Sequence, residues 1–207
     1  MSSYWSIIIA WLLFGSLHSV TASTVVKTWL SSRMGKLYHY YRLFYNLVAL
    51  ATFWVVLDCH RQAPVDYLWS PGRWEQIVGS TVLVVGLIVL WLALRQYDLR
   101  EFTGLNVVWK SPPTYASQLK QGGILGYVRH PLYSGTILVT FALFIISPTI
   151  SNGLLAVFTT LYIRVGIYFE ERKLIQTFGN TYRHYQKRVP MLWPLLRYRK
   201  AQKDHVV

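Results

Sequence analysis

Five long runs of apolar residues are the feature of this sequence that most constrains its fold. A helix that crosses the roughly 30 Å hydrocarbon core of a bilayer needs about 20 residues, because each residue adds only about 1.5 Å. The runs that reach or approach this length cover residues 4 to about 26, 43–57, 77–94, 132 to about 147 and 153–169. We therefore expect an all-α fold, a multi-pass transmembrane helix bundle of about five spans.

The composition supports a membrane protein and excludes several other classes. Of the 207 residues, 53% are hydrophobic and only 14% are charged, against roughly 25% charged residues in a typical soluble domain. The 16% aromatic content argues against a disordered chain, and the single cysteine, Cys59, excludes a disulfide scaffold. His18 and His60 each lack a second ligand at metal-binding spacing, so no metal is expected.

The length favours a single integral membrane domain over residues 1–207. Residues 1–95 contain the first three predicted spans. Residues 96–195 would form a cofactor-binding loop, a helical hairpin and a cytosolic C-terminal segment that covers the cofactor pocket.

The distribution of charge predicts how the chain is oriented in the membrane. The net charge is +13, from 21 Lys and Arg residues against 8 Asp and Glu residues. Most of the basic excess lies in residues 27–42, in residues 95–129 and from Arg164 onwards. Because cytoplasmic loops retain basic residues, we expect the N-terminus outside and the C-terminus in the cytoplasm of a bacterial inner membrane. Nucleic-acid binding is not expected, since topology accounts for the charge.

The first candidate functional cluster occupies residues 122–135, at the entrance to the fourth predicted span. Its glycines permit close approach of backbone to a ligand. Arg129 and His130 can bind a carboxylate, and Pro131 in a first helical turn leaves backbone N–H groups directed outwards. The alternative is purely structural: a loop, a basic stop signal and an N-terminal proline, since a glycine-rich stretch before a helix is a weak signal by itself.

The second candidate cluster begins with Glu170 and Glu171, at the inner end of the fifth predicted span. Adjacent carboxylates at a membrane boundary are costly, so a cationic partner is expected. That partner could be a ligand or the neighbouring Arg172 and Lys173. It could also be Arg164, which lies two helical turns before Glu171 on a similar face.

In this order, the two clusters resemble the membrane-embedded methyltransferases that include isoprenylcysteine carboxyl methyltransferases and phospholipid methyltransferases. The matching elements are Gly-Tyr-Val-Arg-His-Pro-Leu-Tyr-Ser-Gly at 126–135, Glu-Glu at 170–171, Leu174, Phe178-Gly179, Tyr182, Tyr185 and Arg188-Val189-Pro190. The resemblance covers roughly residues 95–195. It implies S-adenosylmethionine as cofactor, enclosed by membrane helices and a cytosolic C-terminal segment, and a small or lipophilic acceptor that enters from the membrane lipid.

The resemblance also implies roles for individual residues. Glu171 is expected at the amino group of the cofactor, with Glu170 beside it. Independently of the resemblance, the positive charge of Arg129 at the site entrance leads us to expect that it acts in catalysis as an electrostatic organiser. The full set of expected cofactor-binding residues is Gln118, Leu119, Lys120, Tyr127, His130, Pro131, Leu132, Tyr133, Glu170 and Glu171.

Further residues favour a thiol as the methyl acceptor. The carboxyl methyltransferases carry a substrate-binding arginine four residues before the glutamate that matches Glu171, and this chain has Ile167 there. The Arg164-Val165-Gly166 stretch and residues 189–194 are similar to bacterial membrane thiol S-methyltransferases and their relatives associated with nitric-oxide respiration. Those enzymes have Leu-Phe-Gly-Leu-Arg-Gln where residues 101–106 read Glu-Phe-Thr-Gly-Leu-Asn, which leaves the subgroup open.

Three other functions remain as alternatives. The acceptor could be an isoprenylcysteine carboxylate or a phospholipid amine. The chain could be a membrane reductase that uses NADPH, because sterol reductases share a related helical architecture. It could also be a non-enzymatic accessory protein of a respiratory complex, with a vestigial cofactor motif.

Overall fold

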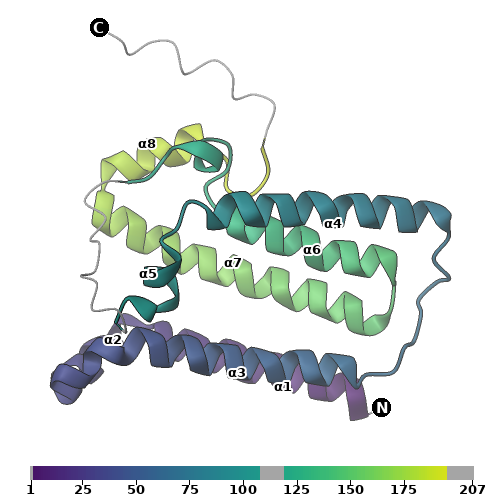
Figure 1. The fold of residues 1–207 in the computed structure, drawn as a ribbon, viewed down its shortest axis with the longest axis horizontal. Coiled ribbons are helices and arrows are strands. Elements are labelled where there is room, and N and C mark those ends of the chain that lie inside the picture. Colours follow the sequence, from purple (N-terminus) through teal and green to yellow (C-terminus); the bar gives the residue numbers. More distant parts are fainter. Residues whose placement is uncertain (1, 108–118, 195–207) are drawn as a thin grey trace, which may run out of the picture. The chain divides into compact units, whose positions relative to one another are not determined.

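The computed structural model describes residues 2–107 and 119–194, and the regular elements within these ranges are helices (Figure 1). The predicted all-α fold is therefore confirmed. The five longest helices fall on the five apolar runs: α1 (Ser2–Ala22), α3 (Tyr41–Arg61), α4 (Arg73–Leu94), α6 (Pro131–Ile146) and α7 (Ile150–Phe178). The shorter elements are α2 (Thr24–Met34), η1 (Gly35–Tyr40), α5 (Leu99–Thr103), η2 (Leu105–Val107), η3 (Gly123–Gly126) and α8 (Asn180–Arg188).

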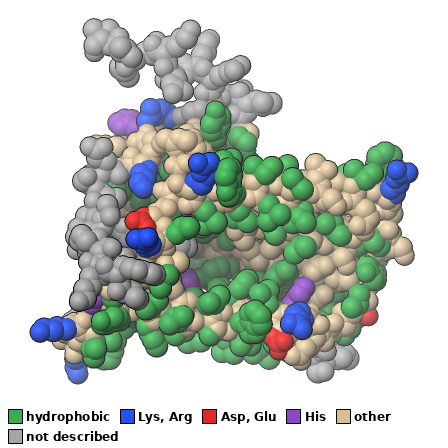
Figure 2. Space-filling model, viewed as in Figure 1, with side chains coloured by type: hydrophobic (Ala, Val, Ile, Leu, Met, Phe, Trp, Pro, Cys, Tyr) green, Lys and Arg blue, Asp and Glu red, His purple; other side chains and the backbone are tan. Residues whose placement is uncertain are grey.

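The helices have the length and surface of membrane spans. Tyr4–Ala22, Thr24–Arg61, Arg73–Leu94 and Ile150–Phe178 are each long and apolar enough to cross a bilayer, and the apolar α6 is shorter, at 16 residues. Large apolar side chains lie exposed along these helices, and Figure 2 shows them as green surface over α4. Such continuous apolar surface is typical of a protein in contact with lipid. The chain is a multi-pass integral membrane protein.

The helices α3 and α7 extend furthest beyond the apolar runs that predicted them. The run at 43–57 lies within the 21-residue helix α3, and α7 continues past Phe169 to Phe178. Residues 170–176 include Glu, Arg, Lys, Leu and Gln, which are good helix formers, so the helix persists after the apolar stretch ends. Gly179 then has φ +54°, a left-handed conformation that favours glycine, and the chain reverses into α8.

The chain divides into two compact units. The first comprises Met1–Ser70, Tyr97–Thr114 and Ser147–Phe158, and in it α1 packs against α3. Trp11 of α1 is buried, with its ring edge-on to Phe53 of α3 and stacked on Phe158 at 6.0 Å between centroids. The side-chain amide of Asn46 donates to the carbonyl of Thr103 at 2.9 Å, which links α3 to α5.

The second unit comprises Pro71–Gln96, Tyr115–Ile146 and Thr159–Val207, and α4 and α6 pack tightly within it. Gly79, Gly86 and Ala93, spaced by seven residues, are the buried positions of α4. A Cβ atom added to Gly86 would lie 3.0 Å from Cβ of Leu138 and 3.1 Å from the backbone nitrogen of Val139 in α6. The two backbones therefore approach more closely than larger residues would allow, as is common between membrane helices.

The C-terminal part of the second unit closes around two small apolar cores. Ile137 of α6 packs with Ile163 and Ile167 of α7 and with Leu192. Beyond Gly179, α8 buries one face, and its core consists of Tyr182, Tyr185 and Val189, packed against Leu119, Leu174, Ile175 and Phe178. These two cores fix the start of α6, the end of α7 and α8 relative to one another.

Candidate functional site

The start of α6 is joined to the C-terminal segment by main-chain hydrogen bonds. The backbone N–H of Arg129 donates to the carbonyl of Pro190 at 2.9 Å, and that of His130 donates to the carbonyl of Met191 at 3.1 Å. The two predicted clusters, some 40 residues apart in sequence, are therefore neighbours in space. All the contacts described below lie within the second unit.

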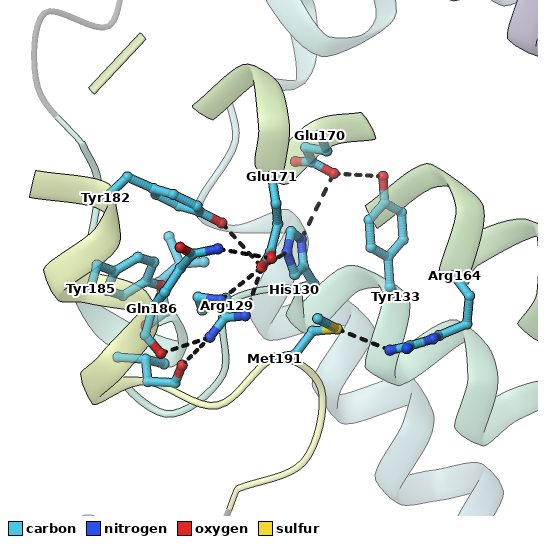
Figure 3. Close-up of polar contacts among 12 residues, drawn as sticks. Arg129, His130, Tyr133, Arg164, Glu170, Glu171, Tyr182, Tyr185, Gln186 and Met191 are labelled. Atoms are coloured by element: carbon cyan, nitrogen blue, oxygen red, sulfur yellow. Dashed lines mark hydrogen bonds and ion pairs between the residues drawn. The ribbon is translucent and has the colours of Figure 1, made fainter. Parts of the chain in front are cut away.

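Arg129 and Glu171 form a buried ion pair at the centre of this region (Figure 3). The Nε and Nη2 atoms of Arg129 donate to Oε1 of Glu171 at 2.8 and 2.7 Å. Its Nη1 donates to the carbonyl oxygens of Gln186 at 3.1 Å and Val189 at 2.5 Å. The two side chains are only 8% and 13% exposed, so the guanidinium charge is balanced inside the protein. Charge-assisted bonds of this kind are among the strongest in proteins.

Two residues of α8 complete the surroundings of Glu171. The Tyr182 hydroxyl donates to Oε1 at 3.3 Å, and the Gln186 side-chain amide donates to Oε2 at 2.9 Å. Tyr182 and Gln186 lie one helical turn apart, so both face the same carboxylate. Burial, together with the negative charge of Glu171, raises the pKa of Tyr182 and keeps its hydroxyl a donor. We call Arg129, Glu171, Tyr182 and Gln186 the clamp.

Glu170, His130 and Tyr133 form a second group beside the clamp, in which Glu170 is the accessible member, and we call it the Glu170 group (Figure 3). The Tyr133 hydroxyl donates to Oε2 of Glu170 at 2.9 Å, and the His130 ring stacks on the Tyr133 ring at 5.6 Å between centroids. Nε2 of His130 lies 3.1 Å from Oε1 of Glu171, while its Nδ1 lies 3.8 Å from Oε2 of Glu170. His130 thus bridges the two carboxylates. The side chain of Glu170 is 41% exposed, so a ligand can reach it.

The structure brings together five of the predicted residues, namely Arg129, His130, Tyr133, Glu170 and Glu171. Pro131, the first residue of α6, is fully buried, and Leu132 is half-buried on the same helix.

The remaining predicted residues lie elsewhere or outside the described ranges. Leu119 packs against the apolar core of α8, and Nζ of Lys120 donates to the carbonyl of Gln96 at 3.2 Å. Tyr127 is 71% exposed, whereas its neighbour Val128 is buried, because the turn after η3 directs one of the two inwards. Gln118 lies outside the described residues.

The cationic partner of Glu171 differs from the candidates that its sequence neighbours suggested. Arg164 donates through Nη1 to the sulfur of Met191 at 3.1 Å, and Arg172 donates to the Tyr168 hydroxyl at 3.1 Å. Pairing of Glu171 with either arginine is therefore wrong for this structure. Spacing along α7 suggested those pairs, but the segment just before α6 supplies Arg129 to this carboxylate.

The sequence did not predict two features of the site: Gln186, and the carbonyl groups that Arg129 binds. Gln186 carries no motif of its own, although its spacing of four residues from Tyr182 was a usable signal once a helix there was assumed. The carbonyl groups of Gln186 and Val189 could not be found from residue types, because every residue carries a carbonyl.

Comparison with known proteins gives a family match over most of the chain. Residues 6–196 match the family described as NnrU protein. No solved structure matches the chain.

Among individual proteins, the chain is similar to several methanethiol S-methyltransferases. It is 34% identical over 194 residues to methanethiol S-methyltransferase 1 of Bradyrhizobium diazoefficiens, covering 88% of this chain and 64% of the relative. It is 27% identical to the enzyme of Crocosphaera subtropica, covering 89% and 72%. It is 30% identical to methanethiol S-methyltransferase 2 of B. diazoefficiens, covering 93% and 73%. The chain thus spans about two thirds to three quarters of the length of these relatives, and slightly less than two thirds of the first.

These similarities confirm the resemblance that the two motif clusters predicted. The match covers both clusters and the membrane helices that precede them. The chain belongs to the NnrU family.

Proposed function

We propose that this protein is an integral membrane methyltransferase that transfers a methyl group from S-adenosylmethionine to a small thiol. The observation that carries the proposal is similarity, over 88–93% of the chain, to three proteins named methanethiol S-methyltransferase. The site adds a physical argument, because it combines a buried clamp with an accessible carboxylate on the same helix, α7.

The residues of the Glu170 group fit S-adenosylmethionine as the methyl donor. Its amino-acid end carries an ammonium, which a carboxylate recognises, and the partly exposed Glu170 offers one. When bound, the donor supplies a methyl group on a sulfonium, which is already a good leaving group. The protein therefore has mainly to hold donor and acceptor in line, and the packing of α6 against α7 supports that task.

The surroundings of Ile167 support a thiol rather than a prenylcysteine carboxylate as acceptor. At the position where carboxyl methyltransferases are expected to have an arginine, Ile167 is 2% exposed and packs with Ile137, Ile163 and Leu192. This apolar core contains no group that would bind a substrate carboxylate. A small thiol needs no such anchor.

Arg129 has a positioning role in this proposal. Its charge is balanced by Glu171, and its donors reach Glu171 and two carbonyl groups. It therefore holds the C-terminal segment against α6 and thereby orients His130, instead of polarising the acceptor directly.

We also propose that the chain lies in a bacterial inner membrane with its N-terminus outside and its C-terminus in the cytoplasm. This orientation is supported by the Lys and Arg side chains in three segments, at positions 27–42, 95–129 and from 164 onwards. We propose that residues 1–207 act as one integral membrane domain, since a single family match covers residues 6–196.

The test incubates purified protein with S-adenosylmethionine labelled on its methyl group and separate panels of small thiols, prenylcysteines and lipid extracts. We expect label in the volatile thioether fraction. Label only in the prenylcysteine or lipid fraction would exclude a thiol acceptor. A thermal-shift assay distinguishes the reductase alternative, because stabilisation by NADPH and not by S-adenosylhomocysteine would support a reductase.

A further inference from the structure

Arg164 is a cation inside a membrane-spanning helix. It belongs to α7 (Ile150–Phe178) and is the one charged residue of the apolar run 153–169. Its side chain is exposed, and so are those of Leu161 and Tyr168, which lie one helical turn before and after it and carry large apolar surfaces. An ionisable residue within a span is costly to keep, which favours a role in binding a ligand.

The contacts of Arg164 leave its charge unbalanced among the described residues, 2–107 and 119–194. Within these ranges the guanidinium makes one polar contact, from Nη1 to the sulfur of Met191 at 3.1 Å. A thioether sulfur is a weak, uncharged acceptor, whereas a guanidinium has five N–H donors and stays protonated in proteins. Most of the donors therefore remain for a further acceptor, and a negative charge on that acceptor would balance the guanidinium.

The elements packed against this part of α7 supply no counter-charge. They are α6 (Pro131–Ile146) and the C-terminal stretch 189–194, which share an apolar core with α7. Neither contains Asp, Glu, Lys, Arg or His, and Tyr133 is the titratable residue that they include. The other charged and titratable groups of the site belong to the clamp and the Glu170 group, and their ion pairs are with one another and not with Arg164.

Met191 connects Arg164 to the start of α6. Its sulfur accepts from Arg164, and its carbonyl accepts from the backbone N–H of His130 at 3.1 Å. Met191 and Tyr133 also pack against the same apolar core. Figure 3 shows Arg164 directed towards Met191, with Tyr133 next to them. A ligand held by Arg164 would therefore lie close to the Glu170 group, where the methyl donor is proposed to bind.

The chemistry of Arg164 fits a small anion whose charge lies on sulfur. A guanidinium is more weakly hydrated than an ammonium, and this one already donates to a sulfur atom. When a thiol ionises, its proton passes to water, and its sulfur keeps the electron pair and becomes the nucleophile. A positive charge within about 4–6 Å favours the ionised form, most strongly where little water screens the interaction.

We infer that Arg164 binds the sulfur of the acceptor as a thiolate, through the guanidinium donors that Met191 does not use, and so promotes ionisation of the thiol. This inference rests on the proposed function. It makes Arg164 a catalytic residue that contacts the acceptor. Met191 is then a positioning residue, because it acts by orienting the guanidinium.

The experiment follows the ionisation of thiophenol, a small thiol whose thiolate has its own ultraviolet absorbance, when it is bound to purified full-length protein in detergent. S-adenosylhomocysteine is present, so no methyl transfer takes place. The difference absorbance measured against pH gives the pH at which half of the bound thiol is ionised. Because a positive charge stabilises the thiolate, we expect Arg164→Met to raise this pH by about one pH unit or more. Arg164→Lys keeps the charge and should raise it by less.

Arg172→Met is the matched control. Arg172 also lies on α7 and donates to one hydroxyl, that of Tyr168, at 3.1 Å. Its removal should leave the half-ionisation pH of thiophenol unchanged. Calorimetric affinity for S-adenosylhomocysteine should match the wild type in both methionine variants. Melting temperatures show that each variant is folded, and Arg164→Gln replaces Arg164→Met where the latter does not fold.

The outcomes separate the inference from the proposed function. The same half-ionisation pH in the wild type and Arg164→Met would overturn the inference, as would an equal rise in Arg172→Met. Loss of affinity for S-adenosylhomocysteine in a folded Arg164→Met would also overturn it, since Arg164 would then bind the carboxylate of the donor. In each of these cases a labelled thioether from the wild type would still support the proposed function. A wild type that methylates no thiol would contradict that function itself.

Discussion

Arg129 directs its positive charge at groups of the protein. In the structure its donors reach Glu171 and the carbonyl groups of Gln186 and Val189, with the side chain 8% exposed. Its contacts connect α6, α7 and α8, so its removal should affect stability before chemistry.

Substitution of Arg129 by methionine is expected to destabilise the protein by about 3–5 kcal/mol, because it leaves Glu171 buried without its counter-charge. Thermal or denaturant unfolding in detergent measures the change. The double variant Arg129→Met with Glu171→Met removes both charges, and we expect it to recover more than half of the loss. A single variant as stable as the wild type would show that the ion pair does not hold the C-terminal segment.

For individual residues, the sequence predicted which side chains lie close together in the site. It did not predict which of them form hydrogen bonds and ion pairs with one another. Arg129, His130 and the two glutamates could be proposed from motif order alone. Which glutamate is enclosed depends on where α8 lies, and that position follows from Gly179 and from burial of Tyr182 and Tyr185. Such tertiary information is not carried by any local pattern.

At the element scale, the helices were more predictable than the contacts between them. Apolar runs locate spans well, because lipid requires about 20 apolar residues in a helix. The close approach of α4 and α6 depends instead on small residues at particular positions, Gly79 and Gly86 in α4 and Gly135 in α6. This packing fixes α6, whose first turns carry Pro131 and Tyr133.

Gly86→Val is expected to destabilise the protein by about 1–3 kcal/mol and to weaken binding of S-adenosylhomocysteine, because the added methyl groups force α4 and α6 apart. Gly166→Ala in α7 is the matched control, since a Cβ atom there meets nothing within 4 Å. The control should gain about 0.5–1 kcal/mol from better helix propensity. Equal melting temperatures for the two variants would argue against a tight α4–α6 contact.

Across the whole molecule, the distribution of charge predicts the membrane orientation proposed above. The basic loops flank the described helices in the alternation expected of spans that cross in turn. The single cysteine makes this orientation convenient to test, because Cys59→Ser gives a background free of other thiols.

In that background, His184→Cys on the exposed face of α8 and Ser70→Cys before α4 should react on opposite sides of the membrane. A membrane-impermeant maleimide is expected to label the cysteine at position 70 in intact cells and that at position 184 only in inside-out vesicles. The reverse pattern would invert the proposed topology, and labelling of both in intact cells would contradict the predicted number of crossings between them.

The distance along α7 from its first residue to Glu170 and Glu171 can be compared with the thickness of the membrane. The helix begins at Ile150, so roughly 20 residues precede Glu170, a length of about 30 Å and close to the thickness of the hydrocarbon layer. We therefore expect Glu170 to lie where the aqueous phase and the lipid phase adjoin. A water-soluble, charged donor and an oil-soluble, uncharged acceptor partition into different phases, and this boundary is where their concentrations overlap.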